Sequence, residues 1–352
     1  MLKRILAVLL VLSFCLAVGC SKGKEQLSVD VGEEGNSVTE SSASDVPETG
    51  INPLTGLKDI DDGKENDRPV AITINNVKVA QPVQTGLNKA DIVYETEVEY
   101  GITRLVAIFQ DVSKVAKIGT VRSARYPFID IAMGHNAIYV HHGQDNEHAA
   151  SHLKDLDRFV LPTTNEGERV KNGLAQEHTL YAKGDKLWAT LSQKFNVKNT
   201  SSDTWLKFAE EDVVLGNTAN SVKVPFSSSV TSTFKYDAST KRYVRHFYDD
   251  VRKDYVTGET FNFKNVFVLS TSIYDYPGCK EPQWGKGAHQ KVELESGTGY
   301  YFVNGTYTTI NWKKGASTNS FKFTDSEGKE LVVQPGNMWI CIADKSAAPV
   351  IE

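Results

Sequence analysis

The sequence lacks a cluster of lysine and arginine residues, although its 352 residues include 39 of these cations against 44 acids. A net charge of −5 with dispersed cations argues against a nucleic-acid partner, which would require a concentrated basic surface. The chain also lacks a long apolar run. Its strongly hydrophobic stretch, residues 5–19, is shorter than the roughly 20 residues that a membrane-spanning helix needs.

Familiar catalytic motifs are missing too. The sequence contains no glycine-rich phosphate loop followed by Lys-Ser/Thr, no GxSxG and no HExxH. It therefore indicates no cofactor, leaves enzymatic activity undecided and favours a binding function.

Cysteine is scarce, with four residues in the chain. Cys15 lies in the N-terminal hydrophobic stretch and Cys20 follows that stretch directly, so only Cys279 and Cys341 remain for the folded part. These two could form a disulfide outside the cell or remain separate buried thiols, and two cysteines far apart in sequence do not decide between these states.

The N-terminus has the pattern of a secretory signal. Two cations in MLKR precede an apolar segment that ends in small residues, which predicts a signal peptide over residues 1–19. The sequence AVGC resembles a bacterial lipobox, so we expect diacylglyceryl attachment and fatty acids such as palmitate at Cys20. Residues 20–50 are rich in Ser, Glu and Gly and predict a disordered tether. The expected location is the outer face of the cytoplasmic membrane, with the lipid as the anchor.

The rest of the chain divides into two predicted domains, over residues 51–218 and 219–352. In the first, short β-rich runs alternate with apolar helical patterns, which predicts an α+β or α/β domain with a mixed sheet and flanking helices. Strands are expected in RPVAITINN, on both sides of Gly101, in KIGTV and in AIYVHHG. Helices are expected in YPFIDIAMGHN, NEHAASHLKDLD and KGDKLWATLSQKF. The second domain has short alternating runs separated by turns and is predicted to be mostly β, with its strongest hairpin signal at Asn304-Gly305.

Several segments carry a family resemblance. NPLTGL, GLNKADIVYETEVEYGITRLVAIFQ, VRSAR and the C-terminal GTGYYFVNGTYTTINWKKG resemble the YerB-like lipoproteins of Gram-positive bacteria. The resemblance implies two adjoining domains on a lipid anchor and no established activity. The chain departs from the family pattern at Tyr100-Gly101, where relatives tend to have Gly-Gly.

The stretch IGTVRSARYPF suggests an anion site. If KIGTV is a strand, Arg122 lies at its C-terminal end and Arg125 in the turn before a helix that begins near Pro127. In α/β sheets ligands bind at that end of the strands, and guanidinium groups suit carboxylate or phosphate. Arg104, His142 and His178, also at ends of elements, are expected to join the site. The alternative is that Arg122 and Arg125 pair with internal acids such as Glu95, Glu99 or Asp130.

Glu95, Glu97 and Glu99 alternate along one predicted strand. They would share a face with neighbours about 7 Å apart, a spacing that suits the acid and base of an inverting glycosidase. A solvated sheet face is the favoured alternative.

His148, His152, Asp145 and Asp155 form a stripe on a predicted helix, but the pattern HAASH lacks the glutamate of HExxH. We interpret the stripe as a polar outer face and predict no metal site. Trp284, Trp312 and Trp339 are interpreted as core or edge residues and not as a sugar-binding platform.

These patterns together predict a lipid-anchored envelope protein that binds an anionic or carboxylate-bearing wall component or a partner protein. Two alternatives remain open. One is a wall glycan or peptide hydrolase that uses Glu95 or Glu99 with His142. The other is a scaffold for membrane-bound wall-synthesis proteins.

Overall fold

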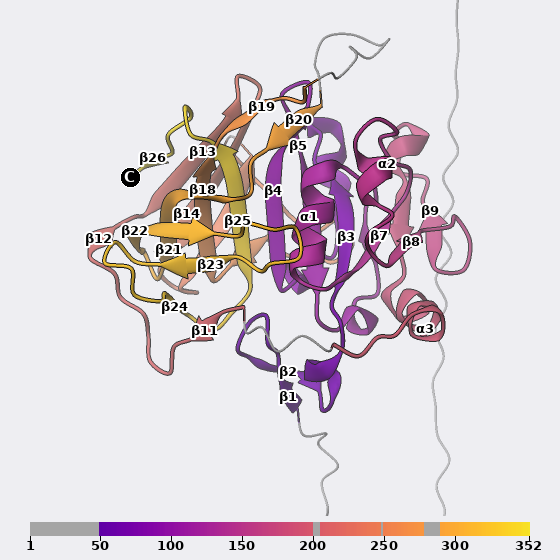
Figure 1. Cartoon of the computed structure of the whole chain (residues 1–352), viewed down its shortest axis with the longest axis horizontal. Coiled ribbons are helices and arrows are strands. Elements are labelled where there is room, and N and C mark those ends of the chain that lie inside the picture. The colour runs from indigo at the N-terminus through magenta and orange to yellow at the C-terminus, as the bar shows by residue number, and fades with distance from the viewer. Residues whose placement is uncertain (1–48, 200–204, 248, 278–288) are drawn as a thin grey trace, which may run out of the picture. The chain divides into compact units, whose positions relative to one another are not determined.

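The computed structural model describes residues 49–199, 205–247, 249–277 and 289–352 (Figure 1). The predicted signal peptide, Cys20, residues 20–48 of the predicted tether, Cys279 and Trp284 lie outside these residues. The last two residues of the predicted tether belong to a strand, Thr49–Ile51. Within the described part no helix is both long and apolar enough to cross a membrane.

An 11-stranded mixed sheet is the largest element of the fold, and it draws strands from both predicted domains. Its strands, in spatial order, are β12 (Asn217–Thr218), β22 (Thr306–Lys313), β21 (Ser296–Val303), β18 (Asn265–Thr271), β25 (Met338–Asp344), β4 (Ile92–Glu99), β5 (Ile102–Phe109), β3 (Val70–Asn75), β7 (Ile138–His141) and β8 (Arg158–Val160), with β23 (Lys322–Thr324) paired to β22. The last strand of this sheet along the chain, β25, pairs in parallel with both β18 and β4, and Met338 lies opposite Ile92.

A second sheet of six strands contains β16 (Asp250–Val251), β15 (Arg242–Phe247), β14 (Val230–Asp237), β13 (Ser221–Ser227) and β26 (Val350–Ile351), with β17 (Asn262–Phe263) paired to β15. The smaller sheets are β6 (Ile118–Gly119) with β10 (Leu180–Ala182) and β9 (Gly167–Arg169), β1 (Thr49–Ile51) with β2 (Lys58–Asp61), β11 (Lys207–Phe208) with β24 (Val332–Val333), and β19 (Ile273–Asp275) with β20 (Gln290–Val292).

Helices are few in the described residues. The α-helices are α1 (Tyr126–Gly134), α2 (Ala149–His152) and α3 (Gly184–Lys194), and the 3₁₀ turns are η1 (Lys64–Asn66), η2 (Lys78–Val83), η3 (Leu87–Lys89), η4 (Val112–Lys114) and η5 (Gln176–His178). The protein is therefore mostly β with a mixed sheet, and the expected helical flanks cover less of the chain than the sequence pattern indicated.

Hydrophobic side chains cover both faces of the large sheet. On one face, Val93, Leu105 and Trp339 pack in one cluster with residues of the six-stranded sheet such as Phe234. On the other face, alternate residues of the same strands pack in a second cluster with α1, which lies across β4 and β3 in Figure 1. Successive side chains of a strand point to opposite faces of the sheet, so the central strands are buried on both faces.

Local sequence signals account for several elements. Pro127 stands in the first turn of α1, as expected from its fixed φ and missing N–H. Asn304 and Gly305, with φ of 50° and 73°, join β21 to β22 in the predicted two-residue hairpin. Trp312 and Trp339 are buried core residues, as predicted.

Two predicted elements are shorter than expected. The helix predicted in NEHAASHLKDLD is a single turn, Ala149–His152. The strand predicted in KIGTV is the two-residue β6, which pairs with β10 in a side sheet and not in the large sheet.

Candidate functional site

Several strands of the large sheet end at one shared edge, here called the carboxyl edge. Strands β3 and β7 are parallel, and both β3 and β4 are antiparallel to β5, so β3, β4 and β7 run in the same direction. Their last residues are Asn75, Glu99 and His141, and β5 begins at the same edge with Ile102. In open α/β sheets ligands bind at the carboxyl ends of parallel strands, and this edge of the mixed sheet is therefore a candidate binding site.

The loop that carries Arg122 crosses this edge. The backbone N–H of Arg122 donates to Thr73 O at 3.0 Å, and the N–H of His142 donates to Arg122 O at 3.0 Å. Arg122 thus reaches the carboxyl edge through a loop that bridges β3 and β7, and not as the end of a sheet strand as the sequence had suggested. KIGTV does contain a strand, as predicted, but β6 ends at Gly119, before Arg122, and pairs with β10 outside the large sheet.

Two of the predicted arginines share one internal carboxylate. Glu99 Oε1 lies 2.9 Å from Arg104 Nη2 and 2.6 Å from Arg125 Nη2, and its Oε2 accepts from Arg125 Nε at 2.7 Å. Burial opposes the ionisation of Glu99, but the two guanidinium groups outweigh it and lower its pKa to about 2. Arg104, 2% exposed, also donates to Ser123 O. Arg104 and Arg125 therefore tie β4, β5 and the start of α1 together.

Arg122 has a weaker internal partner. Its Nη1 donates to the backbone oxygen of Glu177 at 3.0 Å and to Glu177 Oε2 at 3.1 Å, and the Glu177 side chain is 59% exposed. The Nε of Arg122 is buried and has no hydrogen-bond partner among the described residues. A buried donor without an acceptor costs free energy, so this guanidinium is incompletely satisfied.

The two predicted histidines lie beside these arginines. His178 Nδ1 is 2.8 Å from Asn75 Nδ2, its Nε2 is 3.4 Å from Glu177, and burial lowers its pKa. His142 Nδ1 lies 2.8 Å from Leu161 O, and its Nε2 lies 3.2 Å from Arg169 Nη2. Because a guanidinium only donates, His142 Nε2 acts as the acceptor, which leaves the proton on Nδ1 for Leu161 O.

Arg169 was not predicted, because nothing near it in the sequence distinguishes it from other surface arginines. The edge thus carries Arg104, Arg122, Arg125 and Arg169 around the two carboxylates of Glu99 and Glu177. The structure brings all five predicted binding residues to this edge, but with internal acids already beside most of them.

The glutamates predicted to share a face do not do so. A β-bulge interrupts the pairing of β4 with β5 between Glu97 and Glu99. It turns Glu99 toward Arg104 and Arg125 on the α1 side, whereas Glu95 points to the opposite side and contacts Ser232 of the six-stranded sheet. One inserted residue changes the face to which a strand directs its side chains.

Glu95 is not available to a substrate. Its side chain is 0% exposed, and it accepts hydrogen bonds from Asn76, Thr103, Ser232 and Trp339. Both the glycosidase spacing and the solvated-face alternative are therefore wrong for this residue. Glu99, held between two arginines, has a pKa far too low for a general acid at neutral pH.

The predicted histidine stripe is also rearranged. Asp145 does not lie on α2 but accepts from the backbone N–H groups of Glu147, His148 and Ala149, and so holds the start of the helix. Possible ligand atoms of Glu147, His148 and His289 lie within 4.8 Å of one another, and these residue types can hold a zinc ion. His289 lies in WGKGAH, a segment too short and turn-like to have drawn attention in the sequence.

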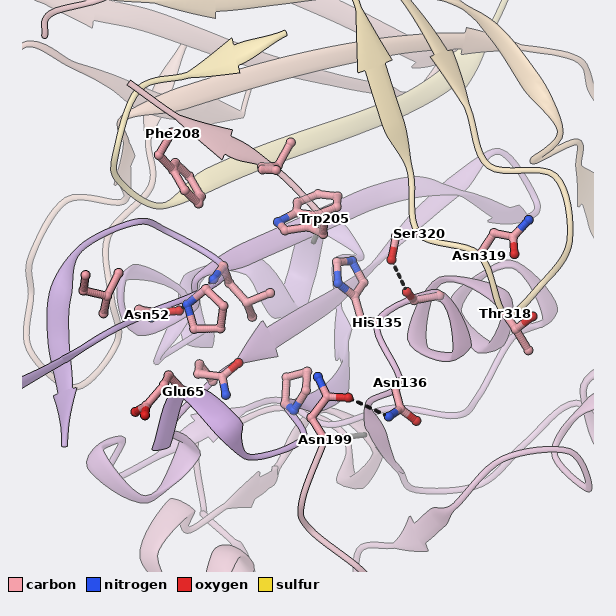
Figure 2. Close-up of a pocket in the computed structure, with 17 residues that line it drawn as sticks. Asn52, Glu65, His135, Asn136, Asn199, Trp205, Phe208, Thr318, Asn319 and Ser320 are labelled. Atoms are coloured by element: carbon pink, nitrogen blue, oxygen red, sulfur yellow. Dashed lines mark hydrogen bonds between the residues drawn. The ribbon is translucent and has the colours of Figure 1, made fainter. Parts of the chain in front are cut away.

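A cavity of about 520 Å³ lies at the opposite edge of the sheet, here called the amino-edge cavity (Figure 2). Its wall includes Pro69 before β3, Gln110 after β5 and His135 after α1. The remaining described lining residues are Ile51, Asn52, Pro53, Leu54, Glu65, Gly134, Asn136, Asn199, Trp205, Leu206, Phe208, Thr318, Asn319 and Ser320. No local sequence pattern indicated this site, because segments that are far apart in the chain contribute to it.

The NPLTG segment builds one wall of this cavity. Asn52 Oδ1 accepts from Leu54 N, and Asn52 Nδ2 donates to Asp91 at 2.8 Å. Gly56 has a φ of +71°, and a Cβ there would lie 2.6 Å from the ring of Phe208. Glycine is therefore required both by the backbone conformation and by the close approach of Phe208.

Comparison with known proteins gives a consistent picture. The description "Protein of unknown function (DUF3048) N-terminal domain" matches residues 54–199, and the corresponding C-terminal domain matches residues 222–340. The chain is 32% identical over 313 residues to the "Putative lipoprotein YerB" of Bacillus subtilis (strain 168), covering 85% of this chain and 88% of the relative. It is also similar to the crystal structure of the YerB protein from Bacillus subtilis, with a TM-score of 0.71 at 28% identity, covering 85% of this chain and 98% of that one.

Proposed function

The chain belongs to the two-domain DUF3048 family of unknown function that includes the YerB lipoprotein, and from this premise we propose that it is a lipid-anchored receptor of the cell envelope. The lipid is attached at Cys20, residues 20–50 are the tether, and residues 51–218 and 219–352 form the two domains on the outer face of the cytoplasmic membrane. The name of the relative and the lipobox-like AVGC support this location.

The proposed ligand is an anionic wall component, and the site is the carboxyl edge with Arg104, Arg122, Arg125, His142 and His178. The observation that carries this proposal is the state of Arg122. Its Nε has no partner among the described residues, and the acid that pairs with its Nη1 is the exposed Glu177. A carboxylate or phosphate from outside can displace an exposed side chain at little cost and satisfy the guanidinium with a bidentate pair.

Arg104 and Arg125 have a different role in this proposal. They are held by Glu99 and supply a fixed positive field at the edge, while Arg122 makes the direct contact. Catalysis by Glu95 or Glu99 with His142 is not part of it, because the Glu95 side chain is fully buried and the pKa of Glu99 is far too low for a general acid. No contact favours a scaffold for wall-synthesis proteins over the binding of a wall component.

The test uses purified cell walls in a sedimentation assay. We expect Arg122→Ala to reduce the bound fraction at least tenfold, with a melting temperature close to that of the wild type. Arg252→Ala is the matched control, because Arg252 is also largely buried, also has an unpartnered Nε and also pairs with an exposed acid, Asp250. Walls stripped of phosphate polymers distinguish a phosphate ligand from a peptide carboxylate.

Equal binding of wild type and Arg122→Ala would overturn the proposed site. The anchor is tested separately by metabolic labelling with palmitate, which we expect Cys20→Ala to abolish together with membrane association. Labelling that persists in Cys20→Ala would contradict the lipidation proposal without affecting the wall-binding result.

A further inference from the structure

We propose that the amino-edge cavity is a second binding site, and that its ligand is an uncharged saccharide. The site is independent of the carboxyl edge, because it lies at the other end of the same strands and shares none of the predicted arginines and histidines. This inference rests on the proposed function only for the location of the protein, which puts the cavity within reach of wall glycan.

The dimensions of the cavity suit a small ligand. Its volume of about 520 Å³ lies within the range of roughly 300–1,000 Å³ that is usual for small-molecule sites. Its wall is contributed by the NPLTG turn, the end of α1, the segment around Trp205 and the loop at residues 318–320. Parts of both matched family segments therefore meet around one hollow.

An unpartnered donor lies in this wall. The Trp205 side chain is 7% exposed, and its indole Nε1 has no hydrogen-bond partner among the described residues. Figure 2 shows the nitrogen edge of the ring turned toward the side of the cavity where Asn52 and Phe208 lie. A buried N–H without an acceptor is unfavourable, so an oxygen atom of a bound ligand would be stabilised here.

The remaining polar lining is rich in amides and, apart from Glu65, its described residues are neutral. Asn136, Asn199, Asn319 and Gln110 carry carboxamides, which offer both donors and acceptors, and Thr318 and Ser320 carry hydroxyl groups. Asn136 Nδ2 donates to Asn199 Oδ1 at 2.9 Å, so these two amides are held in place before any ligand arrives (Figure 2). Fixed amides and hydroxyls match the many hydroxyl groups of a sugar.

The charge of the lining argues against an anion. Among its described residues there is no lysine or arginine, and the one carboxylate is that of Glu65. Burial, assisted by the charge of Lys314, lowers the pKa of His135 to about 3, so this ring is neutral. The cavity thus selects a different ligand from the carboxyl edge.

Aromatic rings complete the match. Trp205 and Phe208 stand on one side of the cavity, with Pro53 and Leu54 also in its wall. The Trp205 ring already packs against His135 and Phe323. The half-buried Phe208 is therefore the ring that can pack against the apolar C–H face of a pyranose while polar groups bind its edge. A peptide would instead be recognised mainly by a row of backbone partners along a strand edge, whereas the described lining consists largely of side-chain amides and rings.

The test titrates the whole protein with N,N′-diacetylchitobiose, followed by tryptophan fluorescence and calorimetry. We expect saturable binding with a Kd of about 1 mM or tighter. Trp205→Phe keeps an aromatic ring at this position but removes the indole N–H, and we expect it to weaken binding at least tenfold. Trp312→Phe is the matched control, because Trp312 is a buried indole outside the cavity whose N–H already donates to Thr298 O.

Three results would overturn the proposal: no binding by a folded wild-type protein, equal affinity in Trp205→Phe, or binding of trialanine in place of the saccharide. The Arg122→Ala variant separates this site from the carboxyl edge. It should lose wall binding and keep chitobiose binding, and failure of either proposal then shows in its own assay.

Discussion

The guanidinium of Arg245, on β15, lies 3.7 Å from the carboxylate of Glu95, on β4, and neither side chain has any exposed surface. The guanidinium also stacks over the ring of Trp339, 4.5 Å from its centre. Ser232 donates to the same carboxylate. A charge pair thus joins the six-stranded sheet to the large sheet within the hydrophobic core.

This pair should be sensitive to the loss of one partner. We expect Glu95→Gln to lower the free energy of unfolding by about 3–5 kcal/mol, since it leaves the Arg245 cation buried without its counter-charge. Denaturant unfolding measures the change, and the double variant Glu95→Gln/Arg245→Met should recover part of it. As a control, Glu293→Gln, which breaks the surface pair with Lys291, should change stability by less than about 1 kcal/mol. A loss at Glu95 no larger than this control would contradict the structural role.

Glu99 should make the protein sensitive to strong acid. Its pKa is lowered from 4.5 to about 2 in the folded state. Its contribution to the free energy of unfolding is therefore complete above pH 4.5 and is lost as the pH falls toward 2. The contribution is about 3 kcal/mol. We expect Glu99→Gln to be less stable at pH 7 and to show a flatter pH dependence between 4.5 and 2. Parallel curves for the two proteins in that window would exclude the ion pair as the cause.

His135 should produce a loss of stability at milder pH. Its folded pKa is about 3, below the usual 6.5, and its Nε2 lies 2.8 Å from the hydroxyl of Tyr94. The unfolded chain therefore takes up the proton first, and stability falls as the pH drops from 6.5 toward 3. We expect His135→Gln to flatten the pH dependence of stability between pH 6.5 and 4.5 relative to the wild type. An imidazole NMR titration of His135 with a midpoint near 6.5 would contradict this.

Tyr100 occupies a backbone conformation that suits glycine. Its φ is 58° in the two-residue turn between β4 and β5, and the next residue, Gly101, has a φ of 67°. Tyr100→Gly should stabilise the protein by about 1 kcal/mol, since it relieves the cost of a left-handed non-glycine residue. Gly101→Ala is the opposite control and should destabilise, because its Cβ would also lie 3.3 Å from Ser227. A lower melting temperature for Tyr100→Gly would show that side-chain contacts of the tyrosine outweigh the strain.

Much of the local structure follows from short-range signals. Pro127 and the apolar spacing after it predict α1, and Asn304-Gly305 predicts the hairpin, because each signal acts within a few residues. KIGTV and NEHAASHLKDLD show the limit of such signals. Both have acceptable local patterns, but their length is set by what they pair with and pack against.

The candidate site depended more on long-range contacts. The sequence identified Arg104, Arg122 and Arg125 as cations near element ends and left open whether they face a ligand or internal acids. It could not indicate that Glu99 holds two of them, because the bulge that turns Glu99 toward them is a property of strand pairing. Trp205 and the amino-edge cavity had no sequence signal, since their neighbours come from distant segments.

The sequence alone determined the turns, the start of α1 and the burial of most strands, because these depend on residue type and local spacing, and it predicted a lipid anchor at Cys20. The tertiary structure decided that β25 would lie between β18 and β4, that Glu95 would be enclosed and that Arg122 would keep only an exposed partner. Such outcomes depend on which strands meet across hundreds of residues, and alternation of apolar residues specifies that a face is buried without specifying its partner.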